Sequence, residues 1–399
     1  GTRRVDRVAR RLDRDPRAHH ASREDGIGHL VEGDSRPVDR RRQLQQRSDL
    51  RSCAVGLRRD GGRDSGRSCR SAREQLAAAG DVRHGCRFVG VAQGRARTGG
   101  RHSDRGGTGL IGRALCQHWQ RQGHDLFVWS RDPAQVLRLC SGAQGIAQLQ
   151  ALDGSAPLDA VVNLAGAPIA NRPWTAAPWD LLWRSRVDLT RTLVNWIGQQ
   201  ATPPRVLLSG SAVGWYGDGG EQWLAEDSAP GNADFGSRLC MAWEQEAKRA
   251  RQWGVRLALL RTAPVLASQG GMLARLLPPF RLGLGGRLGS GQQWMPWIHL
   301  DDQVALMDHL LHNDACSGPY NACAPEAVRN TDFTQTLART LHRPAVLPAP
   351  AWALRLALGE MSVLLLGGQR LVPRRTQQTG FAWRYPGLAG ALKQLLGSC

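Results

Sequence analysis

The sequence predicts an α/β protein built on a doubly wound parallel sheet, and three observations predict it. Strand-like and helix-like stretches alternate from residue 106 onward. A glycine-rich turn, GGTGLIG at 106–112, runs directly into the first helix-like stretch. Polar residues follow two of the strand-like stretches, at the carboxyl ends where parallel sheets bind their ligands.

The expected elements run from the glycine turn to the end of the chain. Helix-like stretches have apolar residues at helical spacing, whereas strand-like stretches are short apolar runs. In chain order they are a helix over 110–123, a strand over 125–129, a buried strand that ends in a turn over 159–166, and a long amphipathic helix over 179–200. A strand with its C-terminal loop over 205–217, a helix over 237–254, a strand over 255–266 and a helix over 331–343 follow. We therefore expect a nucleotide-binding domain over 106–335, with substrate loops interleaved, and a smaller C-terminal α/β domain on the substrate side over 336–399.

Residues 1–105 differ in composition from the rest of the 399-residue chain. They contain 26 Arg, no Lys, no Trp, no Tyr and one Phe, and their 26 basic and 14 acidic side chains contribute +12 of the net charge of +19. Because so few apolar residues cannot offset the entropy cost of folding, we expect this segment to be non-globular. Asp residues are scattered among the arginines and aromatic residues do not interleave with them, which argues against a nucleic-acid-binding arm.

The residues directly before the glycine turn, RHSDR at 101–105, cannot form the buried strand that such a turn requires. If His102, Ser103 and Asp104 are encoded CAT TCT GAT followed by C, a shift of one base reads ATT CTG ATC, which encodes Ile-Leu-Ile. Our leading hypothesis is therefore that residues 1 to about 105 are an out-of-frame translation. A disordered linker and a functional basic arm are the alternatives, and the DNA across codons 95–110 decides among the three.

Cysteine usage and hydropathy favour a soluble protein. The nine cysteines are scattered, with no CxxC pair and no His/Cys cluster at metal-ligand spacing, so we expect a reducing compartment and no metal. We see no leader and no apolar run of the ~18–20 residues that span a membrane. The best candidate, ALRLALGEMSVLLLGG at 353–368, is interrupted by Arg355 and Glu360. We expect a cytoplasmic protein with a small-molecule substrate, and neither a membrane nor a nucleic acid as partner.

The glycine turn has the spacing of a dinucleotide-binding loop. Gly106 permits a tight turn, Gly109 lets the backbone approach a diphosphate, and Gly112 lets the helix pack close to the sheet. The helix then offers unpaired N–H groups and the positive end of its dipole to phosphate. The candidate cofactor contacts in this turn are Gly106, Thr108, Gly109, Leu110, Ile111 and Gly112.

Polar and small residues follow the next two strands. Ser130 and Arg131 stand where an acidic residue would favour NAD, and a hydroxyl with a cation suits the 2′-phosphate of NADP instead. A surface arginine that caps a loop is the alternative. The following strand ends in NLAG at 163–166, where Gly166 and its small neighbours suit contact with the ribose and nicotinamide side of a cofactor. A helix-capping turn explains that spacing equally well.

Seven stretches together resemble the sugar-nucleotide-epimerase-like family of atypical extended short-chain dehydrogenases/reductases, within the NAD-dependent epimerase/dehydratase superfamily. They are GGTGLIGRAL, the Ser-Arg pair, VVNLAG, RSRV, SGSAVGWYG, FRLGLGGRLGSGQQWMPWIHLDD and GEMSVLLLGGQRLVP. The similarity covers residues 106 to about 396. It implies a Rossmann-type sheet that binds NADP(H) and a small C-terminal domain of unassigned role. By this resemblance the cofactor contacts correspond to Ser130, Arg131, Leu164, Ala165 and Arg186, and a solvated helix face is the alternative for Arg186.

The catalytic pattern of the wider class is incomplete here. Short-chain dehydrogenases use a Ser together with a Tyr-x-x-x-Lys pair, in which the Lys lowers the pKa of the Tyr that supplies the proton. This chain has only Lys248 and Lys393, and the residues four positions before them are Glu244 and Ala389. The Tyr–Lys pair is therefore absent.

Ser211 matches the serine of that pattern, and Tyr216 is the candidate proton donor near it. A loop tyrosine that packs beside Trp215 is the alternative for Tyr216. Glu226 is a candidate acid or base if it is buried, and a solvated loop residue otherwise. Arg287, in the glycine-rich stretch GLGGRLGSG, is a candidate contact for an anionic substrate.

Two other patterns predict structural roles. Asp301 or Asp302 is expected to cap the helix that follows WIHL, and Trp179 and Trp183 are expected to share a core-facing side of one helix.

Two functions remain in competition after these observations. The leading hypothesis is an NADP(H)-dependent oxidoreductase or epimerase of the extended short-chain dehydrogenase/reductase type, acting on an unidentified small substrate for which a sugar-like compound is one candidate. The alternative is a non-catalytic NADPH-binding sensor or scaffold, which the missing Tyr–Lys pair favours.

Overall fold

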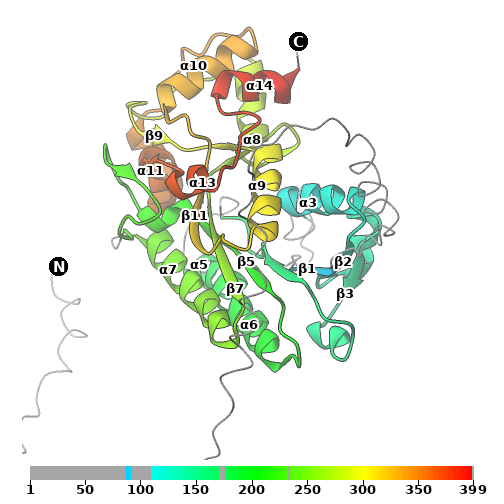
Figure 1. The fold of residues 1–399 in the computed structure, drawn as a ribbon. Helices are drawn as coiled ribbons and strands as arrows, with labels where there is room; N and C mark the ends of the chain where they lie inside the picture. Colours follow the sequence, from blue (N-terminus) through cyan, green and yellow to red (C-terminus); the bar gives the residue numbers. More distant parts are fainter. Residues whose placement is uncertain (1–86, 92–108, 170–175, 232–233, 398–399) are drawn as a thin grey trace, which may run out of the picture. The chain divides into compact units, whose positions relative to one another are not determined.

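The computed structural model describes residues 87–91, 109–169, 176–231 and 234–397 (Figure 1). All of them belong to one compact unit, Asp81–Cys399. Helices cover both faces of a central parallel sheet, and a second group of helices packs at the top of the view in Figure 1.

The sheet has seven parallel strands in the order β11-β7-β5-β4-β1-β2-β3. Their bounds are β1 (Arg87–Val91), β2 (Asp125–Trp129), β3 (Gln144–Ile146), β4 (Ala160–Asn163), β5 (Val206–Ala212), β7 (Arg256–Thr262) and β11 (Gly318–Ala322). The chain winds outward from β1 through β2 to β3, returns to β4 on the other side of β1, and then winds outward through β5, β7 and β11. This order is the doubly wound Rossmann topology, so the predicted fold class is confirmed.

Each strand alternates between two cores, as a sheet buried on both faces requires. Phe88 and Leu126 face the core beneath helices α3 and α9, whereas Val89 and Phe127 face the core beneath α6 and α7. The helices that cover the sheet are α3 (Leu110–Arg121), α4 (Pro133–Leu139), α5 (Ala176–Trp183), α6 (Leu189–Gln199), α7 (Phe235–Lys248) and α9 (Leu300–His312). A π-helical turn, Arg184–Asp188, joins α5 to α6, so the long helix predicted over 179–200 is continuous but locally widened.

The central strand β1 comes from the segment that composition predicts to be non-globular. It pairs with β2, where Phe88 lies opposite Leu126, and with β4, where Val89 lies opposite Val161. This strand, RFVGV, is an exception to that prediction because the side chains of Phe88 and Val89 are buried. The sheet-forming part of the chain therefore extends upstream of residue 106, while residues 102–104 of the frame-shift hypothesis lie outside the described residues.

The second group of helices has a core of its own. α8 (Gly271–Arg281), α10 (Asn330–Thr340) and α14 (Leu388–Leu396) pack around Leu273, Phe333 and Leu392. The division predicted at residue 336 stays a prediction, and α8, which precedes it, shares this core with α14. The other elements are β6 (Trp223–Leu224), β8 (Val265–Ala267), β9 (Trp294–Met295), β10 (Ile298–His299), β12 (Val328–Arg329), β13 (Arg370–Leu371), α11 (Ala351–Leu358), α12 (Val363–Leu366) and α13 (Arg374–Gln378).

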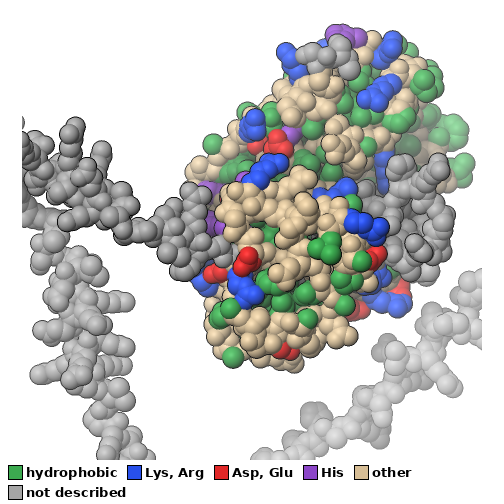
Figure 2. Space-filling model, turned by 90° about the vertical axis from the view of Figure 1, so that its right-hand side faces the viewer, with side chains coloured by type: hydrophobic (Ala, Val, Ile, Leu, Met, Phe, Trp, Pro, Cys, Tyr) green, Lys and Arg blue, Asp and Glu red, His purple; other side chains and the backbone are tan. Residues whose placement is uncertain are grey.

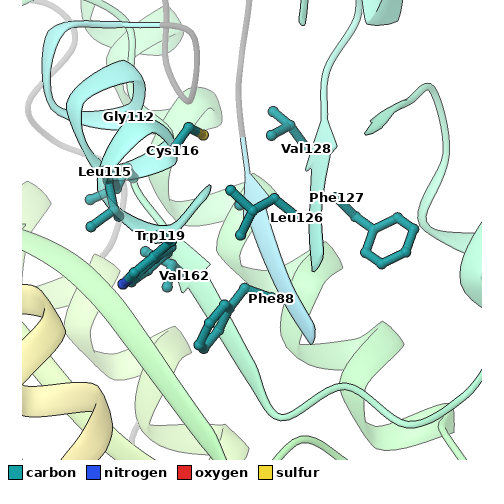
Figure 3. Close-up of a pocket in the computed structure, with 11 residues that line it drawn as sticks. Phe88, Gly112, Leu115, Cys116, Trp119, Leu126, Phe127, Val128 and Val162 are labelled. Atoms are coloured by element: carbon teal, nitrogen blue, oxygen red, sulfur yellow. The ribbon is translucent and has the colours of Figure 1, made fainter. Parts of the chain in front are cut away.

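A small apolar cavity lies between α3 and the centre of the sheet (Figure 3). Its volume is about 20 Å³, and Phe88, Leu115, Trp119 and Val162 are among the residues that line it. Gly90 of β1 faces this space, since a Cβ added there would meet nothing closer than 3.9 Å. A strand residue without a side chain thus leaves a void beneath the helix that begins at the glycine turn.

A polar cluster joins the C-terminal ends of α3 and α9. Asp308 accepts a hydrogen bond from Trp119 Nε1 at 2.7 Å, and its carboxylate lies 3.4 Å from His312 Nδ1 and 3.7 Å from His118 Nε2. Burial alone would raise the pKa of Asp308, but hydrogen bonds from His312 and Trp119 outweigh it and hold that pKa at about 2. The hydrogen bond to Asp308 in turn raises the pKa of His312.

Filling the cavity should stabilise the protein. We expect Gly90→Val to raise the free energy of unfolding by about 1 kcal/mol, because valine suits a strand and its methyl groups enter the void. Urea unfolding measures this difference. The matched control is Gly145→Val in β3, where a Cβ would press against the carbonyl of Pro133 and should destabilise the fold. A Gly90→Val protein that is no more stable than the parent would contradict the cavity.

The Asp308 cluster predicts a pH dependence. The folded pKa of Asp308 is lowered from 3.8, so its contribution is present above that pH and is lost as pH falls toward about 2. The folded pKa of His312 is raised from 6.5, so its contribution is complete below 6.5 and is lost as pH rises through the raised value. We expect Asp308→Asn to cost about 1 kcal/mol between these limits and less outside them. Urea unfolding across pH tests this, with the exposed Asp314→Asn as control.

Candidate functional site

Strands β1 and β4 mark the point where the strand order reverses, and ligands of doubly wound sheets bind beyond the carboxyl ends of the strands there. Helix α3 begins at this point with Gly109 as its extended N-cap. Since Gly109 has no side chain and the first turn of this helix holds no acidic residue, the first N–H groups keep their capacity to bind an anion. Of the predicted contacts in this turn, Gly106 and Thr108 lie outside the described residues.

The other predicted cofactor contacts on α3 are Leu110, Ile111 and Gly112, and all three are held by packing. Gly112 is buried and, together with Leu164, lines the cavity beneath the helix. Ile111 packs against the core on the same face of the sheet. Leu110 reaches the start of α8, where a Cβ on Gly270 would lie 3.3 Å from its Cδ1. The N-terminus of α3 is therefore held between the sheet and the second group of helices.

The two residues after β2 have different surroundings. Ser130 is buried, and its Oγ accepts a hydrogen bond from the backbone N–H of Asp132 at 3.2 Å, so the hydroxyl shapes the turn into α4. Arg131 is exposed, and no described carboxylate pairs with it. Partial burial lowers the pKa of Arg131, although a guanidinium stays charged at neutral pH. Arg131 can thus meet an anion that approaches the end of β2.

Buried hydrogen bonds hold the loop after β4 from beneath. Asn163 Oδ1 accepts from the N–H of Ala165 at 3.2 Å, and its Nδ2 donates to Thr190 Oγ1 at 2.7 Å. Trp243 Nε1 donates to the same hydroxyl at 2.9 Å. Ala165 is itself buried, whereas Leu164 and Gly166 on either side of it are half-buried. The Asn163 side chain therefore positions the loop.

Arg186 is the buried cation of this edge. It lies in the π-helical turn and is 8% exposed, and its guanidinium donates to the carbonyl of Ala167 at 3.0 Å and to Ser185 Oγ at 3.3 Å. No carboxylate pairs with it in the part of the chain that the structure describes. Burial lowers the pKa of Arg186 to about 10, so the group is charged at neutral pH. The alternative of a solvated helix face is wrong.

Close approach of the backbone keeps Arg186 in place. A Cβ on Gly166 would lie 2.9 Å from the Arg186 Cζ, so a side chain there would displace the guanidinium. The Trp243 ring lies on another side, with its centroid 5.5 Å from the same Cζ. An unpaired cation at this depth is costly, and a bound anion would relieve that cost.

Ser211 belongs to a buried charged cluster near the end of β5. Its Oγ donates to Glu244 Oε1 at 2.8 Å, and Glu244 forms a bidentate pair with Arg261 at 2.8 and 3.1 Å. The side chains of Glu244 and Arg261 are 0% and 3% exposed. Burial opposes the charged form of Arg261, but the hydrogen bonds with Glu244 outweigh it and raise the pKa of Arg261. The guanidinium also lies 3.9 Å from the Trp215 ring centroid.

Tyr216 is joined to the same cluster. Its hydroxyl accepts from Arg261 at 3.0 Å and donates to Asn321 Oδ1 at 2.7 Å. Burial raises the pKa of Tyr216 to about 12, against the opposing effect of Arg261, so the phenol is protonated at neutral pH. Glu226 is also buried, and its carboxylate accepts from the N–H groups of Asn321 and Arg375. The structure therefore joins Ser211, Tyr216 and Glu226 through one network, and none of the three is a solvated loop residue.

Sequence reasoning missed the residues that organise this network. Arg261 stands within the apolar strand LALLRT, and Glu244 lies on the buried side of α7. A single charge within an apolar strand signals a buried partner, and that signal was present in the sequence. Asn321, which links Tyr216 to the chain before α13, gave no such signal because Asn is common in turns.

Other expectations meet mixed outcomes. The cap of α9 is His299, whose Nδ1 accepts from the N–H of Asp301, so the predicted aspartate cap is wrong. Asp302 instead accepts from the N–H groups of Arg384 and Tyr385 and holds the C-terminal segment. Trp179 and Trp183 join one apolar cluster, as expected, and Trp179 stacks on Phe235. Arg287 is exposed and donates to Ser290 O at 3.4 Å.

Neither a metal site nor a membrane-spanning helix is present among the described residues. No group of three or more His, Cys, Asp or Glu residues is arranged to hold a metal ion. No described helix has both the length and the apolar character needed to cross a membrane.

The fold and this edge of the sheet define a Rossmann-type nucleotide-binding protein, and comparison with known proteins defines its family. Residues 105–323 match the NAD dependent epimerase/dehydratase family, and the chain belongs to that family. Residues 349–395 match a domain of unknown function, DUF1731. The resemblance stated from the sequence is thereby confirmed.

Individual relatives show the same relationship. The chain is 36% identical over 298 residues to the epimerase family protein YfhF of Bacillus subtilis, covering 73% of this chain and 96% of that protein. It is 37% identical over 295 residues to the epimerase family protein SDR39U1 of Mus musculus, covering 73% and 98%. A crystal structure of human epimerase family protein SDR39U1 with NADPH superposes with a TM-score of 0.67 and 33% identity, covering 77% of this chain and 98% of that one.

The Glu244–Arg261 pair predicts strong coupling in stability. We expect Arg261→Met to cost about 3–5 kcal/mol of unfolding free energy, because it leaves Glu244 buried without a cation. The double variant Glu244→Leu/Arg261→Met should recover most of that loss, since no uncompensated charge remains. Urea unfolding of the single and double variants measures the coupling. The exposed pair Arg374–Asp227 is the control, and Arg374→Met should change stability by less than about 0.5 kcal/mol.

Proposed function

We propose that this protein is an NADP(H)-dependent oxidoreductase or epimerase of the extended short-chain dehydrogenase/reductase type, acting on a small substrate. The observation that carries the proposal is the buried Arg186 guanidinium, for which the described residues provide no carboxylate. It lies beside the loop after β4, at the point where the strand order reverses and where α3 begins with uncapped N–H groups. A cation and a helix N-terminus at this point both suit phosphate.

The residues present fit a nicotinamide dinucleotide. The first-turn amides after Gly109 would hold the diphosphate, and Gly112 lets α3 approach the sheet closely enough to direct them. Arg186 would bind a phosphate or ribose oxygen next to Gly166, in the loop after β4. The family supports this assignment, and so does the crystal structure of human SDR39U1 with NADPH.

Arg131 favours NADP over NAD. It follows β2, where dinucleotide-binding folds place an acidic residue that hydrogen-bonds the ribose 2′-hydroxyl. Here an exposed cation stands at that place, and a guanidinium suits a 2′-phosphate with two parallel hydrogen bonds. Ser130 contributes through the turn that its hydroxyl shapes, which sets the position of Arg131.

Bound NADPH would supply a hydride, and the chain would manage the proton. Ser211 and Tyr216 are the candidates, and Arg261 and Glu244 position both of them. With a pKa of about 12, Tyr216 holds its proton at neutral pH and is an acid rather than a base. A substrate oxygen would have to compete with Asn321 for that proton.

A non-catalytic NADPH sensor or scaffold is the second candidate, and a specific observation favours it. The hydroxyl hydrogens of Ser211 and Tyr216 are already donated within the buried network, and both side chains are at most 5% exposed. The Tyr-x-x-x-Lys pair is absent from the sequence. A protein with this arrangement could bind the cofactor and change conformation without turnover.

Coenzyme titration with two arginine variants tests the binding assignment. We expect Arg131→Ala to weaken NADPH binding about tenfold or more and to leave NADH binding nearly unchanged, because only NADPH has the 2′-phosphate. Arg186→Met should weaken both coenzymes by a similar factor. Isothermal titration measures the affinities, and Arg138→Ala, an exposed arginine on α4, is the control. Equal effects of Arg131→Ala on the two coenzymes would contradict the assignment of the 2′-phosphate.

The Arg186→Met variant should bind coenzyme more weakly but should be more stable than the parent when no coenzyme is present. Without coenzyme it should unfold at a higher urea concentration than the parent, because an apolar side chain replaces a buried cation without a described carboxylate. A variant that binds coenzyme normally would remove the main support of the proposal.

Turnover assays separate the two candidate functions. A reductase consumes NADPH in the presence of a carbonyl compound, and an epimerase converts one isomer into another with no net change in NADPH. A panel of carbonyl compounds and nucleotide sugars, followed by absorbance and by product analysis, distinguishes these outcomes. NADPH that raises the melting temperature while the whole panel stays unchanged would favour the sensor.

A further inference from the structure

Exposed apolar side chains gather on the segment after α8, the segment before α11, and α11 itself. Of the ten large hydrophobic side chains that the described residues leave exposed, six are Leu282, Leu284, Val346, Leu347, Trp352 and Leu356. Trp352 is 69% exposed and Leu356 is 83% exposed, and they stand four residues apart on α11. No described residue of α11 is buried, so this apolar helix lies on the surface of the molecule.

Backbone contacts bring together the segments that carry these residues. The loop after α8 and the loop before α11 run together, with Leu347 N donating to Gly285 O at 3.2 Å and Ala349 N donating to Arg287 O at 2.9 Å. A bridge between Leu288 and Ala349 continues this contact to the start of α11. The six apolar side chains therefore belong to adjacent segments. In Figure 1, α11 lies on the left of the molecule, away from α3 on the right.

The charges around this surface are of one sign. The segments 281–299 and 341–359 contain Arg281, Arg287, Arg343 and Arg355 and no Asp or Glu. All four arginines are exposed, and none forms an ion pair with a described residue. The face seen in Figure 2 differs, since basic and acidic side chains are interspersed on it. We call the six apolar side chains, together with Arg281, Arg343 and Arg355, the apolar–basic face.

We propose that the apolar–basic face docks onto a membrane surface that contains anionic phospholipids. Protruding Trp, Leu and Val side chains can enter the boundary between head groups and acyl chains, while arginines beside them meet lipid phosphates. Tryptophan is enriched at this boundary because one end of the ring is apolar and the other can hydrogen-bond. The stretch that includes α11 is too short and too interrupted to span a bilayer, so the contact is peripheral.

Charge argues against a second copy of this chain, or its own N-terminal segment, as the partner of the apolar–basic face. A second copy joined through the same face would bring its arginines against those of the first. Residues 1–105 carry a net charge of +12 and would also be repelled. An acidic protein could pair with the arginines, but it would also need a concave site to receive the six apolar side chains. A lipid surface accepts these side chains without a preformed site, so we infer a lipid surface as the partner. This proposal does not rest on cofactor binding.

Vesicle flotation of the full chain tests the proposal. We expect co-flotation with vesicles of phosphatidylcholine and phosphatidylglycerol, and weak co-flotation with phosphatidylcholine alone. Trp352→Ser/Leu356→Ser should lower the partition coefficient on the mixed vesicles about tenfold or more, because two buried side chains are lost from the lipid contact. Arg343→Gln/Arg355→Gln should lower it on the mixed vesicles only. The basic segment 1–105 is present in every protein compared, so its attraction to lipid cancels.

Trp223→Ser is the matched control, since this tryptophan is 56% exposed but lies outside the apolar–basic face. It should partition like the parent. The proposal is overturned if the Trp352→Ser/Leu356→Ser protein floats like the parent, or if the parent does not float with the mixed vesicles. It is also overturned if light scattering shows that the parent is a dimer which this double variant dissociates. The same holds if an acidic protein binds the apolar–basic face and the mixed vesicles do not. An unchanged midpoint of urea unfolding verifies that the variants are folded.

Discussion

A doubly wound sheet needs a strand at its centre that pairs on both sides, and the rest of this molecule depends on β1 in that place. β1 pairs with β2 and with β4, so it joins the half of the sheet that carries α3 and α4 to the half that carries β5 and β7. It also defines the point where the strand order reverses, which is where α3 directs its first N–H groups. The sequence that fills this place, RFVGV, is imperfect, because Gly90 leaves a void beneath α3.

Two positive features of this part of the protein have no described carboxylate to neutralise them. The amides that open α3 have no side-chain cap, and the Arg186 guanidinium is buried beside Gly166. A buried cation with no counterion lowers stability, and in the proposed function a bound ligand supplies the negative charge. The neighbouring Glu244–Arg261 pair shows the opposite solution within the same protein, since both charges there are neutralised internally and the cluster serves to position Ser211 and Tyr216.

The sequence predicts the local elements well and the long-range ones poorly. β2 spans the expected residues 125–129, and the helix predicted over 110–123 is α3, which ends two residues earlier. The helix predicted over 237–254 is α7, which ends at Lys248 and continues as a 3-10 helix over Arg249–Trp253. Apolar periodicity is a local signal, so it predicts such elements well. β1 could not be predicted, since a five-residue strand in an Arg-rich segment is selected only by its neighbours β2 and β4. The resemblance indicated Arg186, whereas the burial of Tyr216 depends on Asn321, which lies 105 residues further along the chain.

The central claim is that the amides opening α3 hold the diphosphate of a nicotinamide coenzyme. Hydrogen exchange of the Leu110, Ile111 and Gly112 amides, followed by mass spectrometry with and without saturating NADPH, tests it most directly. The account predicts slower exchange at these amides and in the loop that contains Gly166, with the Asp308 end of α9 unchanged. Unchanged exchange at the start of α3, in a protein that NADPH nevertheless stabilises against heat, would contradict it.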